Sequence, residues 1–392
     1  MVGTIDGKNM TNHLSFASHL SFACHLTFAS LFVAASLVAG STYAASGAEA
    51  TPDIGITVRR LSPRTAVFNA GPWDNATVAI ATQKGIVVVD SGFSKTIARL
   101  HREAIQAEFK RSDFAYLINS HEHADHMFGD SEYSDIPLVG SEALRAAVLR
   151  MKSDPAIVAR FMEWPEKSLV FLRQYLLKNN PKAIEGQQFA QVERFWKAVE
   201  ADNPAAAGLI LPAITFDRRM TLNLGDVSVR LFSFDLFHSM ADILISVPEE
   251  NLVLTEAVFA PGLLPYINFP DGAEEGLTAE MLKAEEVNNW FVVLHEVLSQ
   301  ADEKTQFLGC HGRAAMTKAQ CAHEAAYLEK LWNEVRRTKA AGKTLEHAKV
   351  DLGLAMSFAE FADLGDIRSA GNPDEVPSVH QRNIEVLWKA AP

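Results

Sequence analysis

The chain has 392 residues, of which 48% are hydrophobic and 21% charged, values typical of a globular protein with a sizeable apolar core. A formal net charge of -12 argues against a nucleic-acid partner, since the densest basic cluster is only Arg336, Arg337, Lys339 and Lys343 on an expected helix face. We therefore expect a small-molecule substrate.

Residues 1–45 differ in composition from the rest of the chain and are typical of a targeting segment. An apolar run rich in small residues covers 26–45 and ends at a site that suits signal peptidase, near Ala44 or Ala45. Lys8 is the sole lysine or arginine before this run, so a retained membrane anchor is the alternative. We expect a cleaved signal peptide and a periplasmic or secreted mature chain without a membrane span.

The first elements after the leader are predicted to form a βαβ unit. Strands are expected over 55–69 and 76–91, and the solid apolar run at 86–89 indicates a strand buried on both faces. Helical spacing of apolar residues follows over 95–110, and a short strand follows over 114–118. Strand, helix and strand in this order favour an α/β fold.

The centre of the chain is predicted to contain a helical insert. Residues 142–151 and about 155–201 have helical patterns, and the second of these segments has an aromatic-rich apolar face. That face either packs against the sheets or forms one wall of the substrate pocket. Strands are expected again over 213–234, 242–247 and 251–259, with a hairpin turn at 223–226 inside the first.

The remaining elements are a helix over 277–301, a short strand over 306–309 and a second long helix over 317–340. A linker rich in Pro, Gly or Ser is missing from the sequence after residue 55, so one catalytic domain is the simplest division. The predicted parts are a leader at 1–45, a catalytic domain at 55–315 with a helical insert at about 150–205, and a helical C-terminal extension at 316–392.

The strongest functional signal directly follows the strand at 114–118. His121, His123, Asp125 and His126 lie within six residues. Side chains two residues apart point about 200° apart on a helix but share a face at the end of a strand, so His121 and His123 can bind one ion there. The other two side chains then turn toward a second ion. Imidazoles with few carboxylates suit zinc, or less selectively iron or manganese.

This motif resembles the HxHxDH motif of the metallo-β-lactamase superfamily, and the resemblance covers about residues 60–315. Members of that superfamily also carry an aspartate at an upstream strand end, followed downstream by a histidine, an acidic residue and a histidine. The matching residues here are Asp90, His238, Glu256 and His311. The resemblance implies an αββα sandwich with two metal ions at one edge of its sheets.

The resemblance also implies a division of the ligands between two divalent ions, which we expect to be zinc. The first ion would be held by His121, His123 and His238. The second would be held by Asp125, His126 and His311, with Glu256 bridging the two. Asp90 would orient a ligand by hydrogen bonding, and Asp125 would orient the attacking hydroxide and shuttle a proton.

Two positions depart from the family pattern. Glu256 stands where most members carry aspartate; a glutamate here resembles the alkylsulfatases, and it replaces the cysteine ligand of some zinc β-lactamases. The segment at 238–241 replaces the usual His-Thr-Pro-Gly loop, so substrate specificity cannot be carried over from the family. Arg313 is a candidate contact for an anionic substrate group.

Other residues with ligand chemistry are expected outside the metal site. Glu122 would point away from the motif histidines on a strand, and Cys310 is not expected to bind metal. A disulfide between Cys310 and Cys321 is possible in an oxidising compartment, but free buried thiols are the expected state. The histidines expected at the surface or in the core are His101, His295, His323 and His347.

The whole pattern predicts a di-metal hydrolase that cleaves an ester, lactone, lactam or related bond of a small molecule with a metal-activated hydroxide. An alkylsulfatase-like enzyme is one alternative, favoured by Glu256 but disfavoured by His238 and by the short C-terminal extension. A mono-iron persulfide dioxygenase-like enzyme is another, disfavoured by the complete set of seven ligands. A non-catalytic binding protein is disfavoured because no ligand position is lost.

Overall fold

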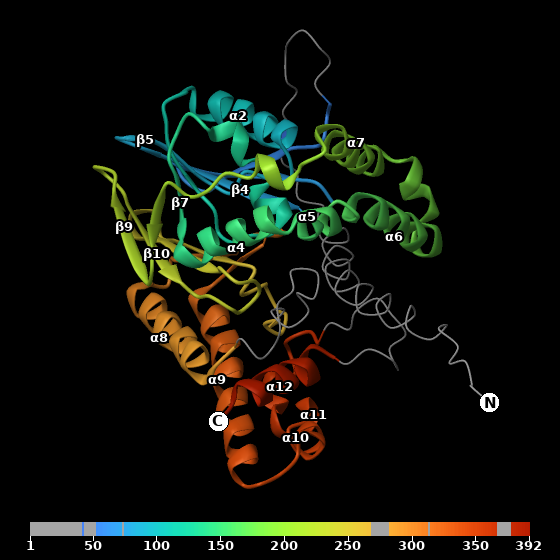
Figure 1. The fold of residues 1–392 in the computed structure, drawn as a ribbon, viewed down its shortest axis with the longest axis vertical. Helices are drawn as coiled ribbons and strands as arrows, with labels where there is room; N and C mark the ends of the chain where they lie inside the picture. Colours follow the sequence, from blue (N-terminus) through green and yellow to red (C-terminus); the bar gives the residue numbers. More distant parts are fainter. Residues whose placement is uncertain (1–40, 43–51, 73, 268–281, 313, 367–377) are drawn as a thin grey trace, which may run out of the picture.

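The computed structural model describes residues 41–42, 52–72, 74–267, 282–312, 314–366 and 378–392. Two β-sheets face each other, and helices cover both outer faces (Figure 1). The predicted αββα sandwich is therefore confirmed, together with a helical C-terminal region. The expected leader lies outside the described residues except for Ser41 and Thr42, and so does Arg313. Within the described ranges, every helix is too short or too polar to cross a membrane.

In the described part of the chain, the first sheet has eight strands in chain order. They are β1 (Ser41–Thr42), β2 (Thr57–Arg60), β3 (Thr65–Ala70), β4 (Asn75–Thr82), β5 (Gly85–Val89), β6 (Phe114–Ile118), β7 (Leu138–Ser141) and β8 (Ile214–Phe216). Strands β1 to β5 pair antiparallel, whereas β5 to β8 pair parallel. The carboxyl ends of β5 and β6 therefore meet at one edge, where open α/β sheets place their ligand sites.

The second sheet has six strands in the order β14-β13-β12-β11-β10-β9. They are β9 (Arg219–Asn223), β10 (Ser228–Ser233), β11 (Ile243–Val247), β12 (Leu252–Glu256), β13 (Gln306–Gly309) and β14 (Ala315–Met316). All neighbours pair antiparallel except β12 and β13, which pair parallel. The predicted hairpin turn lies between β9 and β10.

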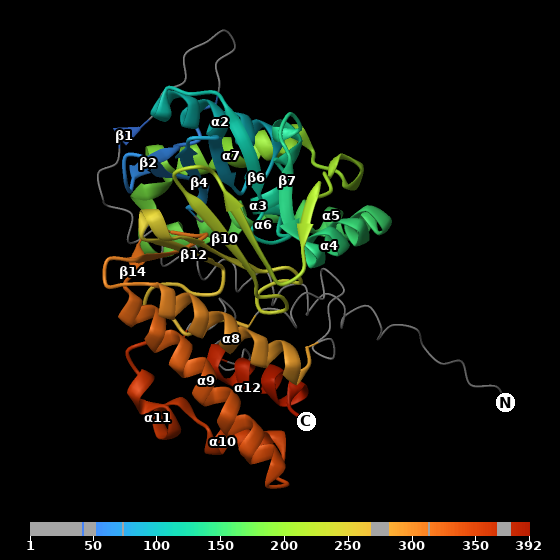
Figure 2. The same ribbon diagram turned by 90° about the vertical axis from the view of Figure 1, so that its left-hand side faces the viewer.

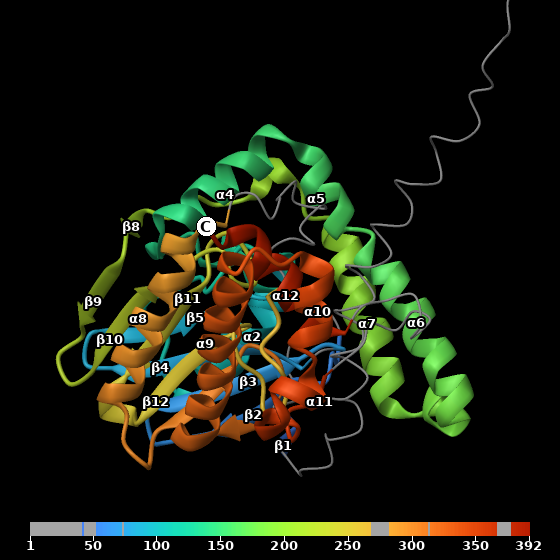
Figure 3. The ribbon, with the colours of Figure 1, turned by 90° about the horizontal axis from the view of Figure 1, so that it is seen from below.

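The outer face of the first sheet is covered by α2 and by the helical insert. These helices are α2 (Lys95–Phe109), α3 (Ala124–Met127), α4 (Glu142–Ser153), α5 (Pro155–Phe161), α6 (Trp164–Asn179) and α7 (Gln187–Asp202). Short 3₁₀ turns lie between them at η1 (Asp130–Tyr133) and η2 (Pro181–Glu185), and η3 (Ala206–Gly208) lies between α7 and β8. Helices α6 and α7 extend to one side of the sheets (Figure 3).

The outer face of the second sheet is covered by α8 and by the C-terminal region (Figure 2). The helices are α8 (Ala284–Gln300), α9 (Lys318–Ala340), α10 (Leu345–Asp351), α11 (Leu354–Ser357) and α12 (Val379–Ala390), with 3₁₀ turns η4 (Pro248–Glu250) and η6 (Ala359–Phe361). The side chain of Thr317 caps the first turn of α9 by accepting from Gln320 N at 3.2 Å, which explains where this helix begins.

The apolar run of β5 is buried on both faces because its side chains alternate. Ile86 and Val88 pack beneath the helices together with Ile97 of α2. Val87 and Val89 face the second sheet, in the same cluster as Ile245 of β11. Strand β7 is too short to show a period of two, which is why the sequence pattern does not indicate it.

Truncation between the sheets tests this packing. Ile245 is fully buried there, so Ile245→Ala should lower the free energy of unfolding by about 2–5 kcal/mol, whereas Val350→Ala on the surface of α10 should change it by less than about 0.5 kcal/mol. Urea unfolding followed by circular dichroism measures both. Equal effects of the two substitutions would contradict the assignment of Ile245 to the inter-sheet core.

Candidate metal centre

The candidate ligands lie on segments that follow strands of both sheets. Asp90 follows β5, and the HxHxDH motif follows β6. His238 lies between β10 and β11, while Glu256 ends β12 and His311 follows β13. The backbone connects the two sheets at this edge, because Ile243 N donates to Ser120 O at 3.0 Å. Residues far apart in sequence are thus brought to one place.

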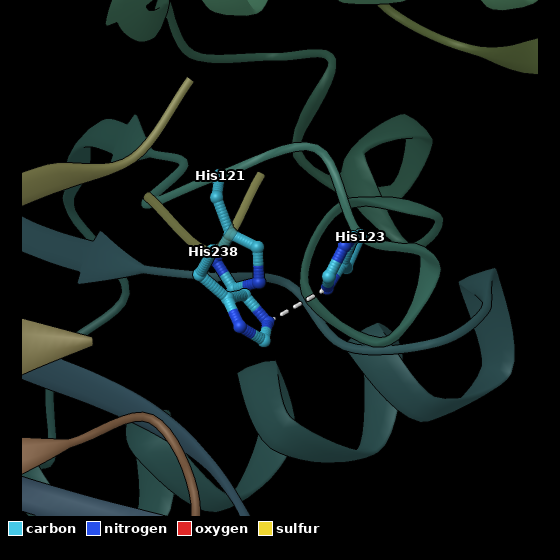
Figure 4. A group of neighbouring side chains, drawn as sticks. All are labelled: His121, His123 and His238. Atoms are coloured by element: carbon cyan, nitrogen blue, oxygen red, sulfur yellow. Dashed lines mark hydrogen bonds between the residues drawn. The ribbon is translucent and has the colours of Figure 1, made fainter. Parts of the chain in front are cut away.

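Three histidines form the first cluster, drawn in Figure 4. One ring nitrogen each of His121, His123 and His238 lies within 4.8 Å of the others, and His238 Nε2 is 3.1 Å from His123 Nδ1. The Nδ1 of His121 is 2.9 Å from Ser120 Oγ, while its Nε2 is buried without a hydrogen-bond partner among the described residues. Leaving such a nitrogen unsatisfied costs free energy, and a metal ion in this cluster would remove that cost.

Two carboxylates hold the loop that carries His238. Asp242 Oδ2 accepts from the backbone N–H groups of His238 and Ser239, each at 2.8 Å, and from that of Phe237 at 3.1 Å. Glu122 Oε1 accepts from Met240 N at 2.6 Å, which joins the motif directly to this loop. Glu122 thus contacts the loop backbone and belongs to neither ligand cluster.

The second cluster contains a cysteine as well as two histidines. Ligand atoms of His126, Cys310 and His311 lie within 4.8 Å of one another. Asp125 Oδ2 is 3.2 Å from His126 Nε2 and 3.6 Å from His311 Nε2, and it accepts from Asn75 Nδ2 at 2.5 Å. Cys310 was not expected to bind metal, but its sulfur lies inside this cluster.

Asp90 lies directly behind the motif and contacts it at three points. Its Oδ1 accepts from Ser120 N at 2.8 Å. Its Oδ2 accepts from Ser120 Oγ at 2.8 Å and is 2.9 Å from His126 Nδ1. The Nε2 of His126 is therefore the nitrogen that faces the second cluster. Asp90 has φ 63°, a left-handed conformation that is uncommon outside glycine and concentrates at functional sites.

Glu256 has a similarly unusual backbone at the end of β12. Its φ is 53°, and the pairing of β12 with β13 shifts register between Leu254 and Glu256. A bulge of this kind redirects a side chain and is common beside active sites. The buried carboxyl group of Glu256 hydrogen-bonds to Ser120 and lies near Asp90 and His126. Neither ligand cluster includes it.

Burial and the neighbouring rings determine the charge of these groups. Burial, together with the surrounding histidines, lowers the pKa of His121 well below its usual value and keeps its ring neutral. Burial also lowers the pKa of His126, but the carboxylates of Asp125 and Asp90 outweigh it and hold that pKa well above the usual value. Burial raises the pKa of the Cys310 thiol to about 12, although His126 beside it acts in the opposite direction.

An aromatic wall closes one side of the first cluster. The ring centroids of Phe161 and Trp164, from α5 and α6, lie 6.1 and 6.4 Å from that of His123. Both side chains are buried against Phe93 or Phe128. The aromatic face of the insert thus packs against the core and also contacts the site.

The remaining histidines and the second cysteine lie away from the two clusters. His101 is buried with its Nδ1 2.9 Å from Thr77 Oγ1. Three of the others contact polar neighbours: His295 contacts Glu329, His323 contacts Asp363, and His347 contacts Thr344. Cys310 and Cys321 are both free thiols, so this structure contains no disulfide between them.

Comparison with known proteins agrees with this architecture. Residues 70–140, which include β5, α2, β6 and the motif, match the family model described as the metallo-beta-lactamase superfamily. This match relates the segment that carries the motif to the metallo-beta-lactamase superfamily and covers only that part of the chain. Members of this superfamily are mostly enzymes, and the fold implies binding of divalent metal ions.

Among curated proteins, the 2,4-dinitroanisole O-demethylase subunit alpha of Nocardioides sp. is 30% identical over 94 residues. That match spans 24% of this chain and only 29% of the relative. Among solved structures, the stereoselective inverting sec-alkylsulfatase Pisa1 from Pseudomonas sp. is similar with a TM-score of 0.53 and 14% identity, covering 94% of this chain and 61% of that one. A metallo-beta-lactamase from Pontibacter korlensis has a TM-score of 0.45 and 11% identity, covering 70% and 99%.

Four residues of the site escape the sequence reasoning. Asn75 is a partner of Asp125 across a long sequence separation, whereas Asp242 holds the backbone of its own loop, which also carries His238. Ser120 lies beside the motif, but its contacts with Asp90 and Glu256 depend on the fold. The adjacency of Cys310 to His311 was visible in the sequence, but the directions of the two side chains were not.

A buried acid beside the motif makes the stability of the folded chain depend on pH. Asp130 Oδ1 accepts from Ser91 Oγ at 2.7 Å and from Asn119 Nδ2 at 3.0 Å. Burial raises the pKa of Asp130 to about 8, and these two hydrogen bonds only partly oppose the shift. The folded chain therefore holds a proton here that the unfolded chain releases near pH 4.

Asp130→Asn removes this ionisation while keeping an acceptor for both donors. The stability of the wild type should fall relative to that of the variant as pH rises from about 5 to 8, by up to about 1.4 kcal/mol per pH unit, and the difference should level off above pH 8. Urea unfolding of both proteins across this range measures it. A difference that does not vary with pH would show that Asp130 ionises normally in the folded chain.

Proposed function

We propose that this protein is a di-metal hydrolase that cleaves an ester, lactone, lactam or related bond of a small molecule. The observation that carries the proposal is the presence of two ligand clusters side by side in a buried edge of the sandwich. The rings of His121 and His126, one from each cluster, have centroids only 4.3 Å apart. Such proximity of neutral and carboxylate-paired imidazoles suits two cations that share one site.

The residues present fit such a pair of ions, which we propose to be zinc. His121, His123 and His238 would hold the first ion. Asp125, His126 and His311 would hold the second, and Glu256, at the bulge of β12, would complete the set. Bound divalent ions would supply an activated water at neutral pH and would polarise the substrate oxygen.

Carboxylates of the chain would then hold the attacking water and one ligand ring in place. Asp125 touches both histidines of the second cluster, and Asn75 fixes the direction of its carboxylate. We assign Asp125 to holding the attacking water and moving its proton. Asp90 keeps the His126 ring in one orientation through Nδ1, which is the role that outer partners of metal ligands usually have.

The exposed edge of the site indicates how a substrate would approach. His238 is half-buried and 18% of the His311 side chain is exposed, whereas the other candidate ligands are buried. Phe161 and Trp164 back the first cluster with apolar surface. We therefore propose a small substrate with an apolar portion next to its cleaved bond.

A sulfate ester is the second candidate substrate. Glu256 at the acidic position resembles the alkylsulfatases of the superfamily, and the sandwich is similar in fold to one such enzyme, although that likeness shows the fold alone. His238 stands against this candidate. The name of the Nocardioides relative, a 2,4-dinitroanisole O-demethylase subunit, adds an activated aryl methyl ether as a third class of candidate substrate.

A substrate panel with matched variants tests the proposal. The panel contains a lactone, a chromogenic β-lactam, a thioester, a phosphodiester, an alkyl sulfate and 2,4-dinitroanisole. We expect turnover of one class, and we expect Asp125→Asn to lower kcat by at least about 100-fold because proton transfer by a placed group contributes about 10²–10⁴. His347→Ala, at the surface of α10, serves as the control and should retain wild-type kcat.

The result is interpreted with metal content measured on the same samples. Loss of turnover in Asp125→Asn together with loss of all metal would assign Asp125 to metal binding alone. Full activity of this variant would contradict the assignment. Turnover of none of the six compounds by a metal-loaded wild type would overturn the proposed substrate range.

A further inference from the structure

We propose that Cys310 is a thiolate ligand of the second ion and completes its set in place of Glu256, so that Asp125, His126, Cys310 and His311 form a closed four-ligand set while the three histidines of the first cluster leave a position open. This inference rests on the proposed di-metal function. It means that the two ions would have different roles, because one would be held by four protein ligands and the other by three. It also assigns a role to a residue that the sequence pattern leaves outside the site.

The position of Cys310 is fixed from both sheets. Its backbone carbonyl accepts from Ala76 N of β4 at 2.8 Å, and its N–H donates to Glu256 O of β12 at 3.1 Å. The thiol is buried, and its sulfur lies within 4.8 Å of ligand nitrogens of both His126 and His311. These two backbone bonds mean that the thiol reaches the cluster without requiring a movement of the chain.

Local backbone geometry explains why two consecutive side chains can face one site. On a regular strand, Cys310 and His311 would point to opposite faces. Strand β13 ends at Gly309, which is opposite Glu256 at the register shift. The chain then turns at Gly312, with φ 77°, where Gly312 N donates to Asp74 O. The alternation of a strand therefore does not apply to residues 310 and 311.

The second cysteine shows what an ordinary buried thiol looks like in this chain. Cys321 of α9 is a member of the large apolar cluster beneath the C-terminal helices. Cys310 is equally buried but belongs to none of the apolar clusters found among the described residues. Its polar neighbours are the imidazoles of His126 and His311 and the carboxyl groups of Glu256 and Asp125. The surroundings of Cys310 therefore suit a metal ligand, whereas the side chain of Cys321 fills space in an apolar core.

The composition of the completed set has two chemical consequences. Thiolate and imidazole together favour zinc over the hard cations magnesium and manganese. Four protein ligands fill a tetrahedral zinc ion, whereas three leave a position for water or substrate. The first cluster, with three histidines, is therefore the one we infer to activate water. The second would bind its ion more firmly and organise the site.

Cobalt(II) titration of the metal-free full-length chain tests this inference. Cobalt takes the place of zinc, its visible absorption reports occupied tetrahedral sites, and a near-ultraviolet charge-transfer band reports a bound thiolate. The chain has three cysteines, Cys24, Cys310 and Cys321, so each is replaced by alanine singly. The wild-type spectrum shows whether sulfur binds the ion, and the variants show which cysteine provides it.

We expect two cobalt ions per wild-type chain and a charge-transfer band that is lost only in Cys310→Ala. That variant should retain the first ion and bind the second at least about tenfold more weakly, since losing even an outer partner of a ligand costs about 10–100-fold. Circular dichroism of the metal-free variants checks folding. If Cys310→Ala does not fold, Cys310→Ser replaces it, because the hydroxyl retains the shape but gives no thiolate band.

The other outcomes separate this inference from the function on which it rests. Two cobalt ions without the band in the wild type, or a band that persists in Cys310→Ala, would overturn the role of Cys310 and leave the di-metal proposal standing. Failure of the folded wild type to bind any cobalt would overturn both.

Discussion

The carboxylate of Asp90 is the contact on which the candidate centre depends. It accepts from the backbone and the hydroxyl of Ser120, and it orients the ring of His126. One side chain at the end of β5 therefore sets both the path of the chain into the motif and the direction of a ligand. The left-handed backbone of Asp90 is the strain that accompanies this placement. The parallel pairing of β5 with β6 makes the contact possible, because it brings the two strand ends together.

Hydrogen bonds also attach the second sheet to the site. Ile243 N donates to Ser120 O, and Met240 N donates to Glu122, so the loop that carries His238 is attached to the motif at two points. Asp242 arranges the backbone of that loop from within. The apolar cluster between the sheets keeps these contacts in register. The geometry of the two candidate ligand clusters thus depends on the whole sandwich and not on one loop.

The parts that could be predicted from sequence are those in which neighbouring residues carry the signal. The alternation around residues 86–89, the helix over 95–110 and the close spacing of His121, His123, Asp125 and His126 all depend on short-range geometry. His238, Glu256 and His311 were identified only through resemblance to a family, because nothing in their own surroundings shows that they meet.

Two of the residues that escaped prediction depend on a backbone irregularity or on a distant partner. Cys310 faces the second cluster because β13 ends at a register shift and the chain turns at Gly312, and neither feature is visible in a pattern of residue types. Asn75 reaches Asp125 across fifty positions. Propensity and periodicity describe single elements, whereas these contacts depend on how elements from two sheets are packed together.

The central claim is that one buried edge holds two metal ions per chain. Elemental analysis of the purified full-length protein, expressed with the common divalent metals supplied together, tests it most directly. The account predicts close to two zinc ions for each folded chain. About one iron per chain, or a folded chain without metal, would contradict it.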